Sequence, residues 1–434
     1  MKNVVIGIIG FGTVGQGVVE VLEKNGQEIA LRTGYQIQIK SVARRHWPAG
    51  ASYPFKCSTD PREIVSDPAI HIVIELAGGE EPARSLIVEA LNNGKHVITA
   101  NKALIAKHGE ELFALARSKG VALEFEASVA GGIPVIKVLR EAMSANEIIE
   151  VAGIINGTSN FILSEMAQKG RSFAEVLAEA QALGYAEADP SFDINGTDAG
   201  HKICILASLA FGIPLQFDRI YIEGIDALTP EDIKTAAELG YGIKHLALAL
   251  RRPDGVEVRV HPTLIPQEAL LCSVNGVMNA VQVKGNAIGT SLYYGAGAGR
   301  LPTASAVVAD LVDIIRELNL DAADRLREFG YQQVRDRESL PVLEPGQFIS
   351  AYYLRLTVAD RVGVLAEIAQ IMAKNGISLQ SVIQKNAEKQ GDNLPLILLT
   401  EPVLESRISQ AIGEISQLDA LRGAVQRIRV ANIA

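Results

Sequence analysis

A segment near the middle of the chain combines several acidic side chains with one lysine. It reads LGYAEADPSFDINGTDAGHK, residues 183–202, and contains Glu187, Asp189, Asp193, Asp198 and Lys202. Asp198 and Lys202 are four residues apart at the start of an apolar helix, so they share a face and would pair even on an inert surface. The further acids exceed what a helix cap requires. A small zwitterion would explain them, because carboxylates bind an ammonium group while a partly desolvated lysine transfers a proton near neutral pH.

The N-terminal stretch IIGFGTVGQG places Gly10, Gly12 and Gly15 between an apolar strand and a helix. In a dinucleotide-binding fold the first glycine permits a tight turn, the second lets the backbone approach a pyrophosphate, and the third allows close helix–strand packing. The helix N-terminus then receives the anion. The context favours a dinucleotide site over a merely tight turn, and the site also includes Phe11, Thr13 and Val14.

At the end of the second predicted strand, SVARR presents Arg44 and Arg45 where a site specific for NAD usually has an acidic residue. Arginine can instead bind a 2′-phosphate, which predicts a preference for NADP(H) with NAD(H) as a possible substitute. The distance from Gly15 exceeds the usual ~20 residues. An ordinary surface arginine pair is the alternative.

Two further motifs follow predicted strands of the same region. TANKALIA places Asn101 and Lys102 at the carboxyl end of a strand, the edge where open α/β sheets bind ligands, although a solvated loop lysine would look the same. EASVAGGIPVI begins with Glu126 and then turns sharply through small residues. Such a turn exposes backbone carbonyls, which are ligands for hard cations. The candidate cation ligands are Glu126, Val129, Gly131 and Ile133, and a glycine-rich hinge is an equal alternative.

Two neighbouring motifs have simpler interpretations. INGTSNFIL, residues 155–163, predicts an Asn-Gly turn followed by a Thr/Ser helix cap. His201 precedes Lys202 but points about a quarter turn away on a helix, so a packing role is expected for it.

The alternation of apolar runs with helical patterns in the first third predicts a parallel, doubly wound sheet of the Rossmann type. We expect this nucleotide-binding domain over residues 1–133, completed by a segment from about 301 to 330 that contains the predicted helix LPTASAVVADLVDIIREL. Residues 134–300 mix longer helices with strands and predict an α+β substrate and dimerisation domain. The polar, proline-containing stretch RDRESLPVLEPGQF resembles a linker.

The region from 348 to 434 shows the order strand, helix, strand, strand, helix, strand, with a turn at Gly391 between the two middle strands. That order predicts a ferredoxin-like domain at the C-terminus.

The bulk properties narrow the class of protein. The 434 residues are 48% hydrophobic with a net charge of −9 and scattered basic residues, so nucleic acid is not an expected partner. Three distant cysteines, Cys57, Cys204 and Cys272, argue against a disulfide framework or a zinc site and favour the reducing cytoplasm. No apolar stretch is long enough to predict a membrane span.

Taken in order, several motifs closely resemble those of homoserine dehydrogenase. They are GFGTVG, ANKALIA, EASVAGGIPVI, INGTSNFIL, LGYAEADPSFDINGTDAGHK and YYGAGAG, and they span roughly residues 4–320. The stretch YYLRLTVADRVGVLAEIAQIMAKNGISLQSVIQ resembles an ACT domain, a regulatory module that binds small molecules. The resemblance implies NAD(P)H-dependent interconversion of aspartate 4-semialdehyde and homoserine, in the biosynthesis of threonine, methionine and isoleucine.

The resemblance also implies roles for individual residues. Lys202 matches the family's proton donor and acceptor, and Lys102 matches the lysine between nicotinamide and substrate. Glu187 and Asp198 match the homoserine-binding carboxylates, and Asp193 is assigned to the same set. Gly184 and Gly299 match backbone positions beside the cofactor. Glu126, Val129, Gly131 and Ile133 match a loop that holds sodium largely through backbone oxygens.

For the C-terminal domain the resemblance implies feedback by threonine, and for the whole chain it implies a homodimer or homotetramer. Asp360, Gly363, Asn375 and Ile377 are the candidate effector positions. The family usually has proline where this chain has Val362, which weakens the expectation of a ligand response there. An ACT domain that serves mainly subunit association is the alternative. For the whole chain, the alternatives are another nicotinamide oxidoreductase of small amino or hydroxy acids, and a non-catalytic sensor.

Overall fold

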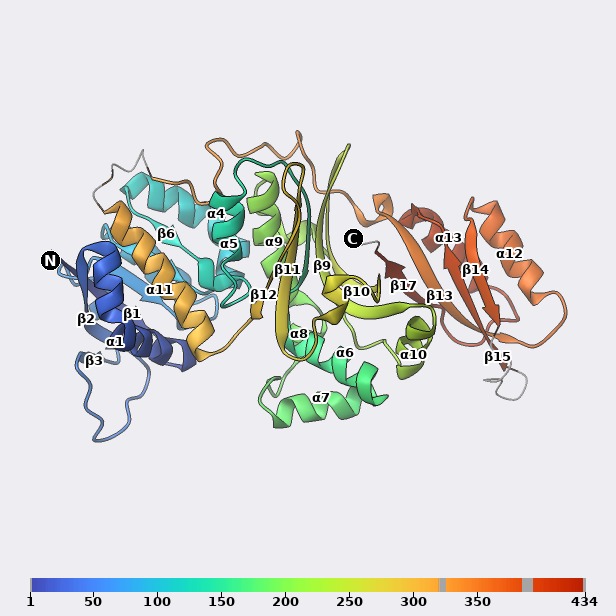
Figure 1. The fold of residues 1–434 in the computed structure, drawn as a ribbon, viewed down its shortest axis with the longest axis horizontal. Helices are drawn as coiled ribbons and strands as arrows, with labels where there is room; N and C mark the ends of the chain where they lie inside the picture. The colour runs from blue at the N-terminus through green and yellow to red at the C-terminus, as the bar shows by residue number, and fades with distance from the viewer. Residues whose placement is uncertain (1, 319, 321–324, 385–392, 432–434) are drawn as a thin grey trace.

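The computed structural model describes residues 2–318, 320, 325–384 and 393–431, and it is elongated (Figure 1). A six-stranded sheet lies at the N-terminal end, in the order β3-β2-β1-β4-β5-β6, and all of its neighbouring strands are parallel. Its strands are β1 (Lys2–Ile9), β2 (Tyr35–Ala43), β3 (Lys56–Ser58), β4 (Ile72–Glu75), β5 (His96–Thr99) and β6 (Leu123–Glu124). The doubly wound Rossmann-type sheet expected from the sequence is therefore confirmed.

Helices connect these strands and cover the sheet. They are α1 (Thr13–Thr33), α2 (Arg62–Val65), α3 (Ala83–Asn92) and α4 (Lys102–Lys119). A later helix, α11 (Arg300–Glu317), returns from the second domain and packs along α1. Gly17 makes this contact possible, because a Cβ placed on it would lie 2.4 Å from the carbonyl oxygen of Arg300.

The second sheet begins in the middle of the molecule with β7 (Ile148–Ile154), β9 (Tyr241–Arg252), β10 (Gly255–Pro266), β11 (Met278–Gly285) and β12 (Gly289–Ala296). The helix α9 (Thr197–Phe211) packs against β7, β9 and β10, and its residues from Asp198 onward are buried. Shorter elements surround it: α5 (Val135–Lys137), α6 (Gly157–Lys169), α7 (Phe173–Ala182), α8 (Ser191–Ile194), β8 (Tyr221–Ile222) and α10 (Pro230–Glu238). Single helical turns are η1 (Glu126–Ser128), η2 (Val138–Ala142), η3 (Phe217–Arg219), η4 (Leu270–Ser273) and η5 (Pro345–Gln347).

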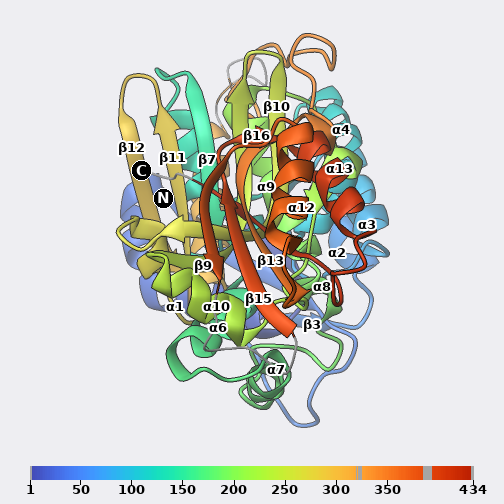
Figure 2. The same cartoon turned by 90° about the vertical axis from the view of Figure 1, so that its right-hand side faces the viewer.

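The C-terminal region has the expected ferredoxin-like order. Its elements are β13 (Ile349–Ala359), α12 (Val364–Lys374), β14 (Leu379–Gln384), β15 (Asn393–Thr400), the short β16 (Val403–Leu404), α13 (Glu405–Ile415) and β17 (Gln426–Val430). The helices α12 and α13 lie together beside the strands (Figure 2). The turn expected at Gly391 lies outside the described residues.

The C-terminal strands continue the second sheet rather than forming a separate one. β17 pairs in parallel with β10, joining Thr263 to Arg429, and β13 pairs with β17 on its other side. The stretch expected to be a linker is also tied down, because Val342 bridges Val256 of β10 and is buried. The segment connects the second domain to the C-terminal one, but it is not a loose linker: Leu340 and Val342 lie in the core, which the polar composition and prolines did not indicate.

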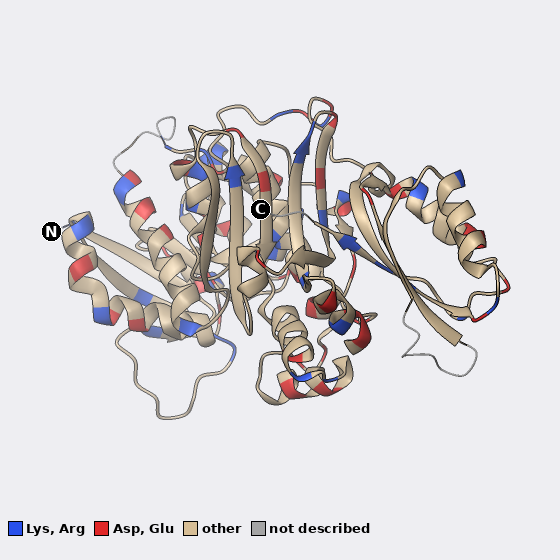
Figure 3. Ribbon diagram, turned by 45° about the vertical axis from the view of Figure 1, so that its right-hand side comes forward, with Lys and Arg blue, Asp and Glu red and all other residues tan. Residues whose placement is uncertain are grey.

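The remaining surface features are simple. Acidic and basic residues are interspersed along the helices (Figure 3). Within the described ranges, no helix combines the length and apolar content that crossing a bilayer requires.

The α1–α11 contact yields a stability prediction. Gly17→Ala should lower the unfolding temperature by several degrees, because the added methyl group meets backbone atoms that cannot move aside. Gly26→Ala is the matched control in the same helix. Nothing lies within 4 Å of a Cβ at Gly26, so this change should be neutral or stabilising by about 0.5–1 kcal/mol. Thermal unfolding of both variants checks the prediction, and equal effects would contradict it.

Candidate active site

The acidic segment and its lysine form a buried charge cluster at the start of α9. The Lys202 ammonium donates to Asp198 Oδ2 at 2.7 Å and to the carbonyl oxygen of Ile155 at 2.6 Å. The Lys102 ammonium lies 3.1 Å from the other oxygen of Asp198. Asp198 therefore links the lysine of α9 to the lysine at the start of α4, bringing together two motifs that are about a hundred residues apart in sequence.

Burial and mutual attraction set the protonation of this cluster. Burial would raise the pKa of Asp198, but the charges of Lys202 and Lys102 hold that pKa well below its ordinary value. Burial lowers the pKa of Lys202; Asp198 opposes this shift, and the positive charge of Lys102 reinforces it. Asp198 is thus a fixed anion, and Lys202 is an ammonium whose proton is easier to remove than that of a lysine in water.

Lys102 is held in place by the residue before it. Asn101 caps α4, accepting from the backbone N–H of Leu104 at 3.2 Å, and its amide donates to the carbonyl of Gly79 at 2.6 Å. This anchors the turn from β5 into α4, so the Lys102 side chain extends from the carboxyl edge of the first sheet toward the second domain. About 30% of that side chain remains exposed, compared with 11% for Lys202.

Asn156 joins the cluster, although the sequence analysis did not include it. It caps α6 by accepting from the backbone N–H of Ser159, and its amide donates to Asp193 Oδ1 and Asp198 Oδ2, each at 2.8 Å. The expected Thr/Ser cap was therefore wrong. The hydroxyls of Thr158 and Ser159 instead bind the carbonyls of Tyr185 and Asp193, which lie in the acidic segment. An asparagine directly after a buried strand was the signal that could have identified it.

Only two of the four acids enter the cluster. Asp193, on α8, reaches it through Asn156, and burial raises its pKa. Glu187 is exposed; its backbone carbonyl accepts from Gln181, and no described contact joins its carboxylate to Lys202. Asp189 binds Ser191 at the start of α8. The substrate-binding role of Glu187 therefore stays a prediction.

His201 has the packing role expected for it. Its ring stacks on Phe217 with centroids 4.2 Å apart and lies 5.5 Å from that of Phe192. Burial lowers the pKa of His201 to about 4, so the ring is neutral near pH 7. Phe192 also lies beside Lys102, whose ammonium is 5.6 Å from its ring centre.

The glycine-rich loop lies at the carboxyl edge of the first sheet, where strand order reverses beside β1. Gly10 has a φ of 100° and passes close to the backbone of Leu76, so a Cβ there would lie 2.5 Å from a backbone carbon. Gly15 packs against the carbonyl of Gly10. No side chain caps α1 at Gly12, which leaves the first amides of the helix available to an anion.

A group of four aromatic rings lies beside the glycine-rich loop and the end of β2. The rings of Phe11, Trp47, Tyr53 and Phe55 are in mutual contact. The Arg44 guanidinium, just after β2, lies 5.6 Å from the ring centre of Trp47 and 6.0 Å from that of Phe11. Among the described residues Arg44 forms no ion pair, so its charge is available to a ligand.

The candidate cation loop is buried between the two sheets. Both carboxylate oxygens of Glu126 accept backbone N–H groups, those of Ile136 and Lys137, and burial raises the pKa of Glu126 to about 7. Among the described residues no donor reaches the carbonyl oxygens of Val129 or Gly131, whereas that of Ile133 accepts from Val135. Unpaired buried carbonyls suit a hard cation. No described cluster of His, Cys, Asp and Glu offers an alternative metal site.

The remaining predicted positions make no described contact with the charge cluster of Asp198, Lys202 and Lys102. Gly184 has a φ of 73° after α7, and Gly299 caps α11 with a φ of 126°. In the C-terminal domain, Gly363 begins α12 and Asp360 lies in the exposed loop before it. Asn375 ends α12 and donates to the carbonyl of Ile371 at 2.9 Å. Ile377 is buried, and Val362 is fully exposed.

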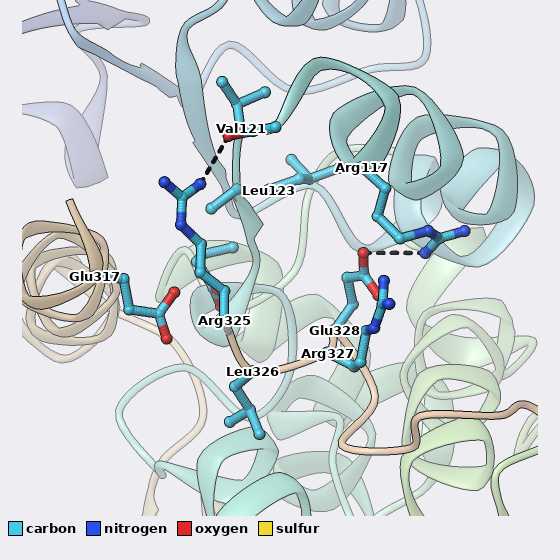
Figure 4. Close-up of a pocket in the computed structure, with 11 residues that line it drawn as sticks. Arg117, Val121, Leu123, Glu317, Arg325, Leu326, Arg327 and Glu328 are labelled. Atoms are coloured by element: carbon cyan, nitrogen blue, oxygen red, sulfur yellow. Dashed lines mark hydrogen bonds and ion pairs between the residues drawn. The ribbon is translucent and has the colours of Figure 1, made fainter. Parts of the chain in front are cut away.

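A cavity of about 220 Å³ lies elsewhere, at the beginning of β6 (Figure 4). Arg117, Glu317 and Arg325 are among its lining residues, and Arg117 pairs with Glu328, which also lines it. None of the predicted site residues lines it. It lies at the opposite strand ends from the glycine loop and Lys102, so we do not assign it to the active site.

Comparisons with known proteins agree with this arrangement. Residues 134–312 match the family model described as homoserine dehydrogenase, residues 10–126 match its NAD-binding domain, and residues 352–420 match the ACT domain. The chain is 54% identical to a homoserine dehydrogenase of Pseudomonas aeruginosa over 99% of both chains, and 48% identical to one of Neisseria gonorrhoeae over the full length of both.

Solved structures give the same result. The crystal structure of a homoserine dehydrogenase from Thiobacillus denitrificans is 52% identical, covers 100% of this chain and 99% of its own, and superposes with a TM-score of 0.94. A hyperthermophilic archaeal homoserine dehydrogenase in complex with NADPH is 25% identical, with a TM-score of 0.61 over 77% of this chain and 100% of its own.

Proposed function

Because this chain belongs to the homoserine dehydrogenase family, we propose that the cluster of Asp198, Lys202 and Lys102 is where the substrate hydroxyl loses or gains its proton. Family membership makes the protein an NAD(P)-dependent oxidoreductase that interconverts homoserine and aspartate 4-semialdehyde. The observation that carries the proposal is the buried lysine with a lowered pKa, held by one carboxylate between two domains.

In the oxidation direction, neutral Lys202 would accept the hydroxyl proton, and in reduction its ammonium would return that proton to the developing alkoxide. When bound, the nicotinamide accepts a hydride from the carbon that bears this hydroxyl in the oxidation direction, and supplies it to that carbon in reduction. Asp198 orients the Lys202 ammonium through their hydrogen bond and stabilises its charged form. Lys102 would lie between cofactor and substrate and add positive charge beside the oxygen.

Substrate recognition would use the remaining acids. Asp193 lies beside the cluster, and Glu187 lies on an exposed segment from which it could turn toward a bound ammonium group. With Asp198, these carboxylates would bind the amino group of homoserine. Gly10, Phe11, Gly12, Thr13, Val14 and Gly15 would hold the cofactor pyrophosphate, and Gly184 and Gly299 would lie against the cofactor.

We further propose NADP(H) as the preferred cofactor, through Arg44, and a sodium ion held mainly by carbonyl oxygens of the loop at Glu126, Val129, Gly131 and Ile133. The free guanidinium of Arg44 supports the first, and the buried carbonyls without donors support the second. The cation would stiffen the turn that joins the first sheet to the second.

We propose threonine as the effector of the ACT domain, sensed around Asp360, Gly363, Asn375 and Ile377. The ACT domain and the second domain are in direct contact, which supports regulation. Arg355 of β13 pairs with the fully buried Asp232 of α10 at 2.6 Å, and Arg429 of β17 donates to Glu223 at 2.8 Å. A change in the C-terminal sheet would therefore reach the residues beside α9.

The assembly and compartment are also proposals. We propose a homodimer or homotetramer, since the second sheet ends at β12 with an exposed Tyr294. Cys57, Cys204 and Cys272 are unpaired, as expected in the cytoplasm.

The first test concerns Lys202. Lys202→Ala should lower kcat for homoserine oxidation by at least ~100-fold, because the general base is removed, and leave NADPH binding near that of the parent. Fluorescence titration of NADPH checks binding, and Lys202→Met controls for the lost apolar stem. Retained turnover, or loss of NADPH binding in both variants, would contradict the role.

The second test concerns Arg44. Arg44→Ala should raise KM for NADPH about tenfold or more, since a charge-assisted hydrogen bond contributes roughly 1.5–3 kcal/mol, and leave KM for NADH unchanged. Arg45→Ala is the matched control on the adjacent exposed residue. An equal rise for both cofactors would instead indicate a general packing role of Arg44 against the aromatic group.

The third test concerns the effector. Threonine should suppress homoserine oxidation by the parent enzyme, and Asp360→Ala should reduce that suppression severalfold without changing kcat in the absence of threonine. Gln370→Ala, on the exposed side of α12, is the control. If threonine does not suppress the parent enzyme at any concentration, the proposal is contradicted and the ACT domain is a structural module.

A further inference from the structure

Asn156 has a more specialised position than a helix cap requires. Its side-chain oxygen accepts from the backbone N–H of Ser159 at 2.8 Å, which fixes the orientation of the amide. The amide nitrogen then points at two carboxylates at once, donating to Asp193 Oδ1 and Asp198 Oδ2, both at 2.8 Å. The side chain thus forms three hydrogen bonds with the protein, and the residue is 7% exposed.

Two consecutive residues hold the two members of the buried ion pair. The carbonyl of Ile155 accepts from Lys202, and the amide of Asn156 donates to Asp198. Because Ile155 directly follows β7, both contacts are fixed to the central sheet. The distance between the lysine and the carboxylate therefore depends on the sheet as well as on the turn of α9 that carries them.

The amide also separates two like charges. Asp193 and Asp198 both bind the Asn156 amide in a largely buried site, and their repulsion contributes to the raised pKa of Asp193 after the larger effect of burial. A donor shared by both carboxylates reduces this repulsion without adding charge. The other charged or titratable groups that face the pair are Lys202 and His201 from α9, Lys102 from α4 and His245 from β9. Burial lowers the pKa of His245, so it remains neutral.

We propose that Asn156 is a positioning residue for proton transfer, which keeps the Asp198 carboxylate aimed at Lys202 and sets the pH at which Lys202 exchanges its proton. This inference rests on the proposed role of Lys202 as general base. Asparagine is suited to the position because it combines an acceptor for the cap with a neutral donor for the carboxylates. Aspartate would supply the cap but bring a third negative charge, and serine would supply the cap without reaching both acids.

The decisive variant is Asn156→Asp, because it preserves the size of the side chain and the capping oxygen but removes the amide donor. The added negative charge should stabilise the ammonium of Lys202. Oxidation of homoserine uses the neutral amine, so the midpoint of the kcat against pH profile should move upward by about one pH unit. At neutral pH, kcat should fall about tenfold, while KM for NADP+ should not change.

Two further variants separate positioning from folding. Asn156→Ser keeps a capping hydroxyl and adds no charge, so it should lower kcat with a smaller displacement of the pH midpoint. Ser172→Ala removes the cap of α7, where Ser172 accepts from Glu175, and is the control for the loss of a cap in the same domain. It should lower the unfolding temperature and leave both kcat and the pH midpoint unchanged.

The outcomes distinguish this inference from the proposed function. If Asn156→Asp shows an unchanged pH midpoint and kcat, or loses activity only in proportion to unfolded protein, Asn156 is merely a cap and the inference is overturned. If instead Lys202→Ala retains turnover, the general base has been assigned wrongly and the proposed function fails, whatever Asn156 does. A shifted midpoint together with an inactive Lys202→Ala supports both.

Discussion

The arrangement of the active site depends on one buried carboxylate that serves two lysines. Asp198 is held between Lys202, from its own helix, and Lys102, from the first domain, and it remains ionised because both positive charges are close. The charges of both lysines oppose the cost of burying that carboxylate. The interaction thus joins the two domains at this point, connecting the first helix residue of α4 in the NAD-binding domain with α9 of the second domain.

Elements on either side of the cluster hold the two domains together, as this constraint requires. α11 leaves the second domain and packs on α1, so the domain that carries Lys202 is tied to the glycine loop through the close approach at Gly17. The turn at Glu126 connects the sheets from the other side, and its N–H donates to Asp310 of α11 at 2.9 Å. Both connections hold the domains near the separation at which Lys102 reaches Asp198.

The C-terminal domain is attached to the second domain through a shared sheet and buried ion pairs. A parallel pair of strands, β10 and β17, makes one sheet of two domains. Arg429 lies almost fully buried between Glu405 of its own domain and Glu223 of the catalytic domain. Glu223 in turn precedes a residue that binds the end of α8, since Ile225 donates to the carbonyl of Ile194 at 3.0 Å. These contacts connect the strands of the ACT domain with the segment that contains Asp193.

The sequence by itself determined the features that depend on local order. Gly10, Gly12 and Gly15 followed a strand and preceded a helix, so their turn was predictable, and the strand and helix order of the C-terminal region specified its fold. The four-residue spacing of Asp198 and Lys202 determined their pairing. Tertiary structure decided everything that needed residues distant in sequence: the Lys102 contact, the exclusion of Glu187 and Asp189 from the cluster, the sharing of one sheet by two domains, and the place of Asn156. The physical reason is that spacing along a helix constrains contacts within a turn, whereas burial and long-range hydrogen bonds exist only once the sheets have packed.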